Sequence, residues 1–549
     1  MSDKINYGVD RRKSSRRRET AEPVVSNHRA GVDRRKQFHK ENAGIKSDRR
    51  SSTRISFYSN VLVLTPSGTL RGQTIDLSEN GMTAVFKGET PGEQFITLKL
   101  CGLEKDQQFF EISLASKVIR VHDSSSESMV VFKFLETENQ KIRPFYLDII
   151  RRINKGDVFY TSIGRVTESL KNWNERYTYF RRIDSAIGKH ILSGNQKLIM
   201  LSSNDYLGLT SHPKVKEAAI KAIERYGTGT GSTMVLSGTL DLHKYLEHKL
   251  AEFKGMESAL LFGTGFMANA GTISTLFKKD YILLNDQYNH ISIFEGCRFS
   301  GSRVRMFRHN DMEHLKKVLK IYKSHKKKAL IVESVFSMDG DLAPLKEISA
   351  LAREHGAVML VDDAHASGVF GQNGRGSLSY FNLEGQVDIV TDSFGKAFAG
   401  IGGYVAGSKE IIDYLRHFSS MAIFTTSLSA ATCATILAAM DVLESDQSLV
   451  AKFWQNVKVL REGLLSLGFD LGRSNAHILP VMIGNEALAY QFSQELQKEG
   501  IFANSVGRPA VPRGKARLRL APMATHDLDD LERALAAFSK VGKKLHVIH

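Results

Sequence analysis

The sequence predicts a multidomain protein in which a small antiparallel β-barrel precedes a larger α/β unit, with a mostly parallel sheet and an α+β domain at its C-terminal end. Two patterns predict this order. The N-terminal third alternates polar and apolar residues, as half-exposed strands do, whereas the rest contains short continuous apolar runs typical of buried parallel strands. The length of 549 residues allows several domains, and 42% hydrophobic residues suffice for sizeable cores.

The first 47 residues are predicted to form a disordered basic tail, because they contain few apolar side chains. A phrase repeats within the tail, at Gly8–Lys13 and Gly31–Lys36. Residues 1–54 contain 16 Lys and Arg against 7 Asp and Glu, so +9 of the formal net charge of +16 lies there. Clustered basic residues bind polyanions, which keeps an anionic membrane or a nucleic acid as a secondary hypothesis. The tail lacks interleaved aromatic residues for base stacking, and this argues against nucleic acid.

Residues 48–140 are predicted to form the barrel. The alternating segments that indicate strands are 55–64, a strand that enters 75–82 after a turn at 66–68, and then 94–100, 110–122 and 129–135. Residues 141–163 are predicted to link the barrel to the second unit, and 143–152 have the pattern of an amphipathic helix.

Two short motifs stand at the start of this barrel, Arg50-x-x-x-Arg54 and Asp76-x-Ser78-x-x-Gly81. Together they resemble the PilZ domain, a bacterial receptor for the second messenger cyclic di-GMP. The resemblance implies that both arginines bind guanine edges and phosphates, while the polar turn and its glycine close round the nucleotide. Fusion to the second unit makes regulation by cyclic di-GMP a hypothesis, and the sequence does not reveal its sign.

Residues 164–549 are predicted to form the larger unit, with a large domain at about 210–430 and a small domain at 431–549. The apolar run 357–361 indicates a buried parallel strand that leads into Asp362, and His365 follows three residues later. Ligands of open α/β sheets bind at such strand ends. A carboxylate there can keep the ring nitrogen of pyridoxal phosphate protonated, and a histidine can contact its phenolic oxygen. The alternative for Asp362 is a helix N-cap.

Lys396 lies between glycines just beyond the apolar run 387–391 and is placed to form a Schiff base, as pyridoxal phosphate chemistry requires. The alternative is a solvated surface lysine. A glycine-rich stretch at 262–269 opens a predicted helix and can bind a phosphate through backbone N–H groups. His290 follows the apolar run 281–284 and can stack on the cofactor ring, although single histidines often serve structural hydrogen bonds.

From about Gly164 to His549 the chain resembles the α-oxoamine synthase family of fold-type I pyridoxal phosphate enzymes. This family includes glycine C-acetyltransferase, 8-amino-7-oxononanoate synthase, 5-aminolevulinate synthase and serine palmitoyltransferase. The segments that carry the resemblance are 203–209, 237–239, 265–269, 289–290, 333–340, 362–365, 393–396 and 517–519. The resemblance implies an aminotransferase-like fold for this unit and a homodimer with shared active sites.

The resemblance also implies roles for individual residues. Lys396 would carry the cofactor, and Asp362 would pair with its pyridine nitrogen. His365 would contact the phenolic oxygen, and His290 would stack on the ring. Further cofactor contacts are implied for Gly265, Phe266 and Met267, the last two through backbone N–H groups to the phosphate, for Glu333, Ser337 and Ser393, and for Thr425 or Thr426 at the phosphate of the neighbouring subunit.

Arg519, assisted by Asn204, would bind the carboxylate of an amino acid substrate, because a planar guanidinium can bind both oxygens. Arg517 would share its strand face, so spacing alone does not distinguish the two arginines. The family's reaction condenses a small amino acid with an acyl thioester and releases carbon dioxide, which leaves an α-amino ketone. Glycine is the first expectation for the amino acid, because residues 541–549 resemble the end of glycine C-acetyltransferases; serine and alanine stay possible.

Met234 stands where many family members have arginine. Its apolar side chain favours an aliphatic acyl group over a charged one, but core filling explains a methionine equally well. The donor is coenzyme A or an acyl carrier protein. Two other functions are considered: an aminotransferase, against which His290 and His365 argue, and a receptor on an inactive enzyme scaffold, against which the retained Lys396 argues.

The sequence predicts a bacterial, cytoplasmic protein without a membrane span. It has no run of about 18 uninterrupted apolar residues, and its charged N-terminus lacks the apolar segment of a signal peptide. The three cysteines, Cys101, Cys297 and Cys433, are scattered without metal spacing, as expected in a reducing compartment, so no metal site is predicted.

Overall fold

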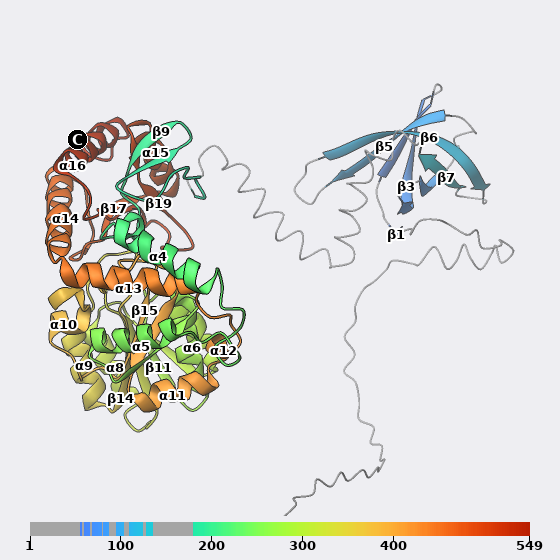
Figure 1. Cartoon of the computed structure of the whole chain (residues 1–549). Helices are drawn as coiled ribbons and strands as arrows, with labels where there is room; N and C mark the ends of the chain where they lie inside the picture. Colours follow the sequence, from blue (N-terminus) through green and yellow to red (C-terminus); the bar gives the residue numbers. More distant parts are fainter. Residues whose placement is uncertain are drawn as a thin grey trace, which may run out of the picture. The chain divides into compact units, whose positions relative to one another are not determined.

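A computed structural model describes residues 179–549 and, before them, the backbone of seven strands between Ile55 and Phe134. The chain divides into two compact units, Met1–Thr167 and Glu168–His549 (Figure 1). Arg50, Arg54 and the helix predicted at 143–152 lie outside the described residues. No helix within 179–549 is long and apolar enough to cross a membrane.

The described part of the first unit is an antiparallel arrangement of seven strands. They are β1 (Ile55–Ser56), β2 (Asn60–Thr65), β3 (Gly68–Ser78), β4 (Gly81–Phe86), β5 (Phe95–Leu103), β6 (Phe109–Asp123) and β7 (Ser128–Phe134). Their order is β1-β3-β2-β5-β6-β7-β4, and β4 also pairs with β3. A strand lies in each of the alternating segments of the sequence, and the segment 75–82 is divided between the end of β3 and the start of β4. Closure into a barrel stays a prediction.

The second unit contains a seven-stranded sheet, ordered β10-β16-β15-β14-β13-β11-β12. The strands are β10 (Ser258–Phe262), β11 (Ile282–Asp286), β12 (Arg303–Phe307), β13 (Lys328–Glu333), β14 (Ala357–Asp362), β15 (Ile389–Ser393) and β16 (Gly403–Gly407). Only β16 runs antiparallel to its neighbours, so the expected mostly parallel sheet is confirmed. Strand β15 begins two residues later than predicted, because the Asp388 carboxylate accepts a hydrogen bond from the backbone N–H of Met359 at 2.7 Å.

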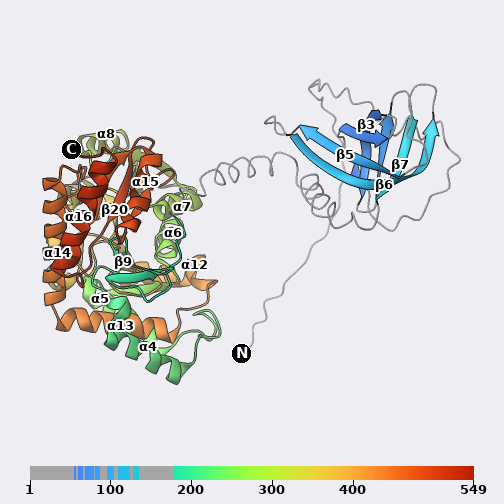
Figure 2. The same cartoon turned by 90° about the horizontal axis from the view of Figure 1, so that it is seen from above.

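Helices cover both faces of this sheet, which explains why its strands are apolar on both sides. Helices α8 (Met312–Ile321) and α9 (Leu345–Glu354) pack on one face, and α6 (Gly265–Leu276), α7 (Ile291–Ser300), α11 (Lys409–Phe418) and α12 (Ser420–Ile423) pack on the other (Figures 1 and 2). Further helices of this region are α4 (Pro213–Tyr226), α5 (Asp241–Lys254), α10 (Ser377–Phe381) and α13 (Ala430–Ser445), with short 3-10 turns at Leu209–Ser211 and Gln372–Gly374.

The smaller domain is built from two distant parts of the chain. Strands β17 (Leu479–Gly484), β19 (Asn504–Val506) and β20 (Ala516–Leu520) form one antiparallel sheet. The second sheet joins β8 (His190–Ser193) and β9 (Gln196–Met200) to β18 (Ile501–Phe502), and Ile199 enters the same core as helices α14 (Ser448–Ser466), α15 (Glu486–Lys498) and α16 (Leu528–Lys544). This domain therefore includes residues near 190–201, which the expected range 431–549 leaves out.

Candidate active site

The carboxyl ends of four neighbouring parallel strands gather most of the predicted residues. His290 follows β11, Ser337 follows β13, Asp362 is the last residue of β14 and Lys396 follows β15. Because these strands are parallel, their carboxyl ends meet at one edge of the sheet. The strand topology therefore brings together residues that lie more than 100 positions apart.

A hydrogen-bond chain, buried at Asn269 and partly buried at His290, connects Asp362 with His290. The amide Nδ2 of Asn269 donates to Asp362 Oδ2 at 2.6 Å and to Ser292 Oγ at 2.9 Å. Ser292 Oγ lies 2.7 Å from Nδ1 of His290, which precedes α7 as its N-cap. The hydroxyl of Thr391 donates to Asn269 Oδ1 at 2.5 Å and fixes the amide orientation. Asp362 does not cap a helix; instead its Oδ1 accepts the N–H of Ala364 at 3.1 Å in a turn.

Two carboxyl groups lie side by side at this edge, since Glu333 and Asp362 are register partners on β13 and β14. Burial raises the pKa of Asp362, and no cation within the described residues forms an ion pair with it. Burial, reinforced by the charge of Asp362, raises the pKa of Glu333 well above its ordinary value. Glu333 Oε2 accepts the N–H of Ser337 at 3.3 Å, whereas its buried Oε1 accepts no hydrogen bond. The pair therefore places two buried carboxyl groups, neither with an ion-pair partner among the described residues, side by side at this edge.

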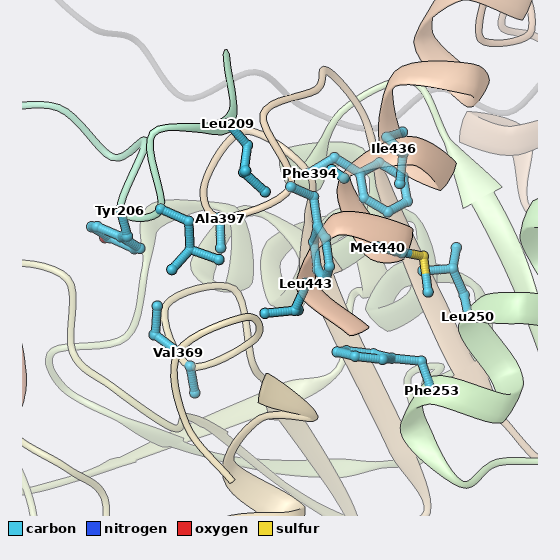
Figure 3. Packing of buried hydrophobic residues seen from close by; sticks show 14 of the residues in the cluster. Tyr206, Leu209, Leu250, Phe253, Val369, Phe394, Ala397, Ile436, Met440 and Leu443 are labelled. Atoms are coloured by element: carbon cyan, nitrogen blue, oxygen red, sulfur yellow. The ribbon is translucent and has the colours of Figure 1, made fainter. Parts of the chain in front are cut away.

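The amine of Lys396 forms no hydrogen bond or ion pair with residues 179–549, although it is half-buried. Burial lowers its pKa, and the charge of Arg519 lowers it further, against the opposite effect of Asp362. The segment that carries it rests on a core cluster, in which Phe394 and Ala397 pack near α5 and α13 (Figure 3). A partly neutral amine on a rigid base suits a nucleophile.

The structure distinguishes the two arginines of β20. Arg517 forms an ion pair with Asp339, with Nη1 and Oδ1 2.7 Å apart, and also donates to the Met338 carbonyl at 3.0 Å. Arg519 is buried and has no carboxylate partner within the described residues; its Nε donates to the Ser337 carbonyl at 2.7 Å and its Nη1 to Asn204 Oδ1 at 3.1 Å. Only Arg519 therefore has a charge left for an anionic ligand.

His365 is buried at the same edge, and Nδ1 of its ring lies 2.7 Å from the hydroxyl oxygen of Tyr206. Burial lowers its pKa well below the ordinary value, and the charges of Lys396 and Arg519 act in the same direction. The ring is therefore neutral. Burial also lowers the pKa of His290, and the charge of Lys396 acts in the same direction, although the residue as a whole is exposed.

The start of α6 offers a site for an anion. Thr264 caps this helix, and its side-chain oxygen accepts a hydrogen bond from the backbone N–H of Met267 at 3.1 Å. The sequence-based prediction was that this N–H group would bind the phosphate of the cofactor, whereas the structure shows it bonded within the protein. The first helical residue, Gly265, lies against β15: a Cβ atom there would lie 2.5 Å from Cβ of Ser393. Only glycine allows this approach. The N–H groups of a helix start attract anions through their partial positive charge.

Other predicted residues lie near the start of α6. Thr425 and Thr426 line a small pocket together with Gly263 and Met234, and Thr426 forms a β-bridge with Thr233. Met234 is half-buried: it packs against a core cluster and also lines this pocket, so core filling and contact with an acyl chain both stay predictions. Phe266 is 40% exposed.

The predicted nucleotide-binding turn lies in the first unit. Asp76 and Ser78 lie on β3, and Ser78 pairs with Gly81 at the start of β4. The register of the pairing between strands β3 and β4 shifts between Thr74 and Asp76.

Four hydrogen-bonding residues of the site were not predicted: Asn269, Ser292, Thr391 and Tyr206. Asn269 and Tyr206 lie inside segments that carry the family resemblance, which is the signal that points to them. Neutral amides and hydroxyls have no charge pattern, so their partners emerge only from the fold.

A second buried cluster braces the loops on either side of the site. His309 lies between two aspartates, with Nδ1 3.0 Å from Asp286 Oδ1 and Nε2 2.8 Å from Asp341 Oδ2. Its ring stacks on Tyr288 with centroids 4.4 Å apart. Asp286 ends β11 ahead of His290, and Asp341 follows the loop of Ser337, so His309 ties together two loops that carry site residues.

Replacing His309 by glutamine is expected to destabilise the protein in a pH-dependent way. Burial alone lowers the pKa of His309, but the two aspartates outweigh it and raise the pKa to about 9. The stabilisation is complete below the unfolded pKa of about 6.5 and is lost as the pH rises through about 9. The difference in unfolding free energy between the two proteins should therefore shrink from pH 6 to pH 10. Exchange of exposed His248, 3.2 Å from Glu252, should show no such trend; an equal trend would contradict the assignment.

The residues of this edge fit pyridoxal phosphate. Within residues 179–549 no cation forms an ion pair with the buried Asp362, which matches a protonated ring nitrogen, and the amine of Lys396 has no partner there, which matches the aldehyde carbon. No cluster of three or more metal-ligating side chains suited to a metal ion occurs within the described residues.

Comparison with known proteins yields two family matches. The family described as aminotransferase class I and II matches residues 196–538, and the PilZ domain matches residues 48–146. The 8-amino-7-oxononanoate synthase of Thermoanaerobacter pseudethanolicus is 45% identical over 367 residues, which are 67% of this chain and 93% of the relative. A corresponding enzyme of Bacillus subtilis, 8-amino-7-oxononanoate synthase 1, is 40% identical over 381 residues, 69% of this chain and 97% of the relative.

Solved structures agree with these relatives. Serine palmitoyltransferase from S. paucimobilis, solved with a bound adduct of pyridoxal phosphate and myriocin, superposes with a TM-score of 0.68 at 34% identity and covers 70% of this chain and 98% of its own. The matches follow the predicted order, with the receptor-like unit before the enzyme-like unit.

Proposed function

The chain belongs to the aminotransferase class I and II family and is a pyridoxal phosphate-dependent acyltransferase of the α-oxoamine synthase type, and we propose that it condenses glycine with an acyl thioester to an α-amino ketone. The observation that carries the proposal is that Lys396, without a partner among residues 179–549, and the buried Arg519, without a carboxylate partner among them, lie at one edge of the sheet. Lys396 would be displaced from the cofactor by the amino group of an amino acid, and Arg519 would bind its carboxylate. Serine and alanine are the alternative amino acids.

Several residues would hold the cofactor. Asp362 would bond the ring nitrogen, His365 the phenolic oxygen, and His290 would stack on the ring, while Lys396 would hold the aldehyde carbon. The phosphate would be surrounded by Gly265, Phe266, Met267, Ser393 and Thr425 or Thr426. The remaining contacts with the cofactor would come from Glu333 and Ser337. Pyridoxal phosphate, when bound, withdraws electrons from the α-carbon of an attached amino acid.

The side chains of this protein would direct that reactivity. Arg519 and Asn204 would hold the substrate carboxylate and so orient the bond that breaks when carbon dioxide leaves. The Nζ atom of Lys396 would accept the α-proton, and the burial that lowers its pKa favours the neutral amine that this step needs. The carboxyl group of Asp362 would pair with the ring nitrogen and so stabilise a protonated ring.

The relatives named above are synthases rather than aminotransferases, which disfavours the amino-transfer alternative. Incubation of the purified protein with glycine, serine or alanine and a panel of acyl-coenzyme A and acyl carrier protein thioesters tests the proposal. Mass spectrometry should show one α-amino ketone, together with free thiol and carbon dioxide in equal amounts. A keto acid without thiol release would instead indicate amino transfer, and no product with any pair would reject the synthase.

Exchange of Arg519 for lysine is expected to raise the KM for the amino acid by about 10- to 100-fold, because the planar two-point contact with the carboxylate is lost. The measurement is the initial rate at varied amino acid and fixed thioester. Arg517→Lys is the matched control: its guanidinium serves Asp339, so the KM should stay within about threefold. A larger KM effect at Arg517 would exchange the two roles.

We propose further that the first unit binds cyclic di-GMP through Arg50, Arg54, Asp76, Ser78 and Gly81 and regulates the synthase. The PilZ match to residues 48–146 supports binding, and covalent fusion motivates regulation. Regulation requires that the nucleotide bind two states of the enzyme with different affinity. Calorimetry with the wild type and Arg50→Ala tests binding. Unchanged turnover at saturating nucleotide would reject control of activity and leave recruitment of a partner as the use of the domain.

A homodimer with shared active sites is proposed as the working assembly. Three exposed apolar side chains lie close in sequence to predicted site residues. Phe424 precedes Thr425, Leu236 follows Met234 by two positions, and Ile401 lies in the segment that follows Lys396. Exposed apolar surface of this kind is typical of a subunit interface. Sedimentation should show a dimer, and a mixture of Lys396→Ala and Thr425→Ala subunits should recover activity only if the two residues serve the same site from different subunits.

A further inference from the structure

Tyr206 is a buried side chain that the proposed function does not use, although its hydroxyl contacts two parts of the site. The hydroxyl oxygen lies 2.7 Å from Nδ1 of His365 and 3.3 Å from Oδ1 of Asn204. Asn204 Oδ1 also accepts the hydrogen bond from Arg519 Nη1 at 3.1 Å. One hydroxyl therefore lies between the histidine assigned to the cofactor and the pair assigned to the substrate carboxylate.

The Tyr206 ring has little freedom to move. His477 meets it edge-on, with ring centroids 4.4 Å apart and planes at 73°, and Phe453 packs on it at 5.8 Å. The ring belongs to the core cluster that also contains Ala397, next to Lys396 (Figure 3). Because the ring is held on several sides, the hydroxyl cannot turn away from His365 and Asn204 without repacking this core.

We infer that Tyr206 is a positioning residue that determines which ring nitrogen of His365 carries the proton. A hydroxyl has one proton to donate, and the contact with Nδ1 is the shorter of its two contacts. Donation to Nδ1 makes that nitrogen the acceptor, so the proton of the neutral ring lies on Nε2. Nε2 makes no hydrogen bond to the described residues and is left to donate to a ligand oxygen.

The charges around the pair support this arrangement. Burial raises the pKa of Tyr206, so its hydroxyl stays protonated and can donate. The titratable and charged groups acting on His365 are Lys396, Arg519, His477 and His290, and all of them disfavour a second proton on its ring. The identity of the ligand oxygen, the phenolic oxygen of pyridoxal phosphate, rests on the proposed function.

The test is the pH dependence of the absorbance of the bound cofactor, which reports proton binding without turnover. A hydrogen bond from Nε2–H favours the anionic form of the phenolic oxygen, so Tyr206→Phe should raise the midpoint of this titration by about half to one pH unit. The effect should vanish when His365 is already alanine, because the two residues act as one unit. A shift of the same size in the His365→Ala background, or no shift in either, would overturn the inference.

Two matched variants separate hydrogen bonding from packing. Tyr226→Phe removes a surface hydroxyl that bonds Asp241 at 2.7 Å and should leave the midpoint unchanged. Phe453→Leu disturbs the packing of Tyr206 but keeps its hydroxyl; a shift equal to that of Tyr206→Phe would mean that packing is the cause and would overturn the inference. Because the titration needs no substrate, it can succeed even if no thioester pair yields a ketone, so failure of the proposed function is distinguished from failure of the inference.

Discussion

Replacing Lys396 by alanine is expected to lower ketone formation by at least about 10⁴-fold, because one amine serves both as the attachment point of the cofactor and as the proton acceptor. The lowered pKa of Lys396 and its lack of any partner among residues 179–549 make it the amine best prepared for both tasks. The measurement is single-turnover product formation by mass spectrometry at saturating glycine and thioester. Exchange of one lysine would then remove nearly all of the catalysis.

A chemical experiment tests the same assignment without turnover. Borohydride reduction of the wild-type protein with its cofactor should label the peptide that contains Lys396. Lys409→Ala is the matched control, since the Lys409 side chain is 71% exposed and pairs with Asp413; its activity should stay within about twofold of the wild type. Label on another lysine, or more than about 1% residual activity in Lys396→Ala, would disprove the assignment.

Replacing Lys254 by methionine is expected to destabilise the protein by about 3–5 kcal/mol, the largest stability effect that the structure indicates. Its ammonium lies 2.6 Å from Asp363 Oδ2 and 3.4 Å from Asp392 Oδ2, and all three side chains are fully buried. Burial alone lowers the pKa of Lys254, but the two aspartates outweigh it and raise the pKa. Removal of the cation would leave two carboxyl groups buried without compensation.

Chemical denaturation of the second unit, followed by circular dichroism, measures this loss. Lys244→Met is the matched control: its side chain is 55% exposed and 3.1 Å from Glu247, so it should cost less than about 1 kcal/mol. Asp363 follows Asp362 and Asp392 precedes Ser393, so the cluster also holds the ends of β14 and β15 in place. An equal, small effect in both variants would show that the buried charges are not coupled.

The sequence was a good guide to the elements that local patterns determine. The apolar runs became strands β11, β14 and β15, and the glycine-rich stretch opened α6 at Gly265 as predicted. Residues at strand ends were predictable because a parallel sheet brings those ends together whatever lies between them. The alternating pattern of the N-terminal third likewise predicted strands there, and its two short motifs predicted the PilZ match.

The sequence did not predict which strands pair when they lie far apart along the chain. Nothing in the local pattern of 190–200 indicates that β9 pairs with β18, three hundred residues later, and so completes the small domain. The sequence around Met234 likewise does not reveal that this residue packs against a core cluster and also lines a small pocket. Such contacts depend on which surfaces meet after folding, and one sequence without partners does not specify them.

By itself, the sequence determined the order of the two units, the strand ends of the candidate site and the residue types placed there, because these follow from periodicity and spacing along the chain. Spacing left Arg517 and Arg519 equivalent and the family resemblance pointed to Arg519; the tertiary structure supplied the physical difference, since Asp339 approaches Arg517 and not Arg519. It likewise joined Asn269 to Asp362 and Tyr206 to His365. The physical reason is that hydrogen bonds and ion pairs act over a few ångströms, and folding alone decides which groups come within that distance.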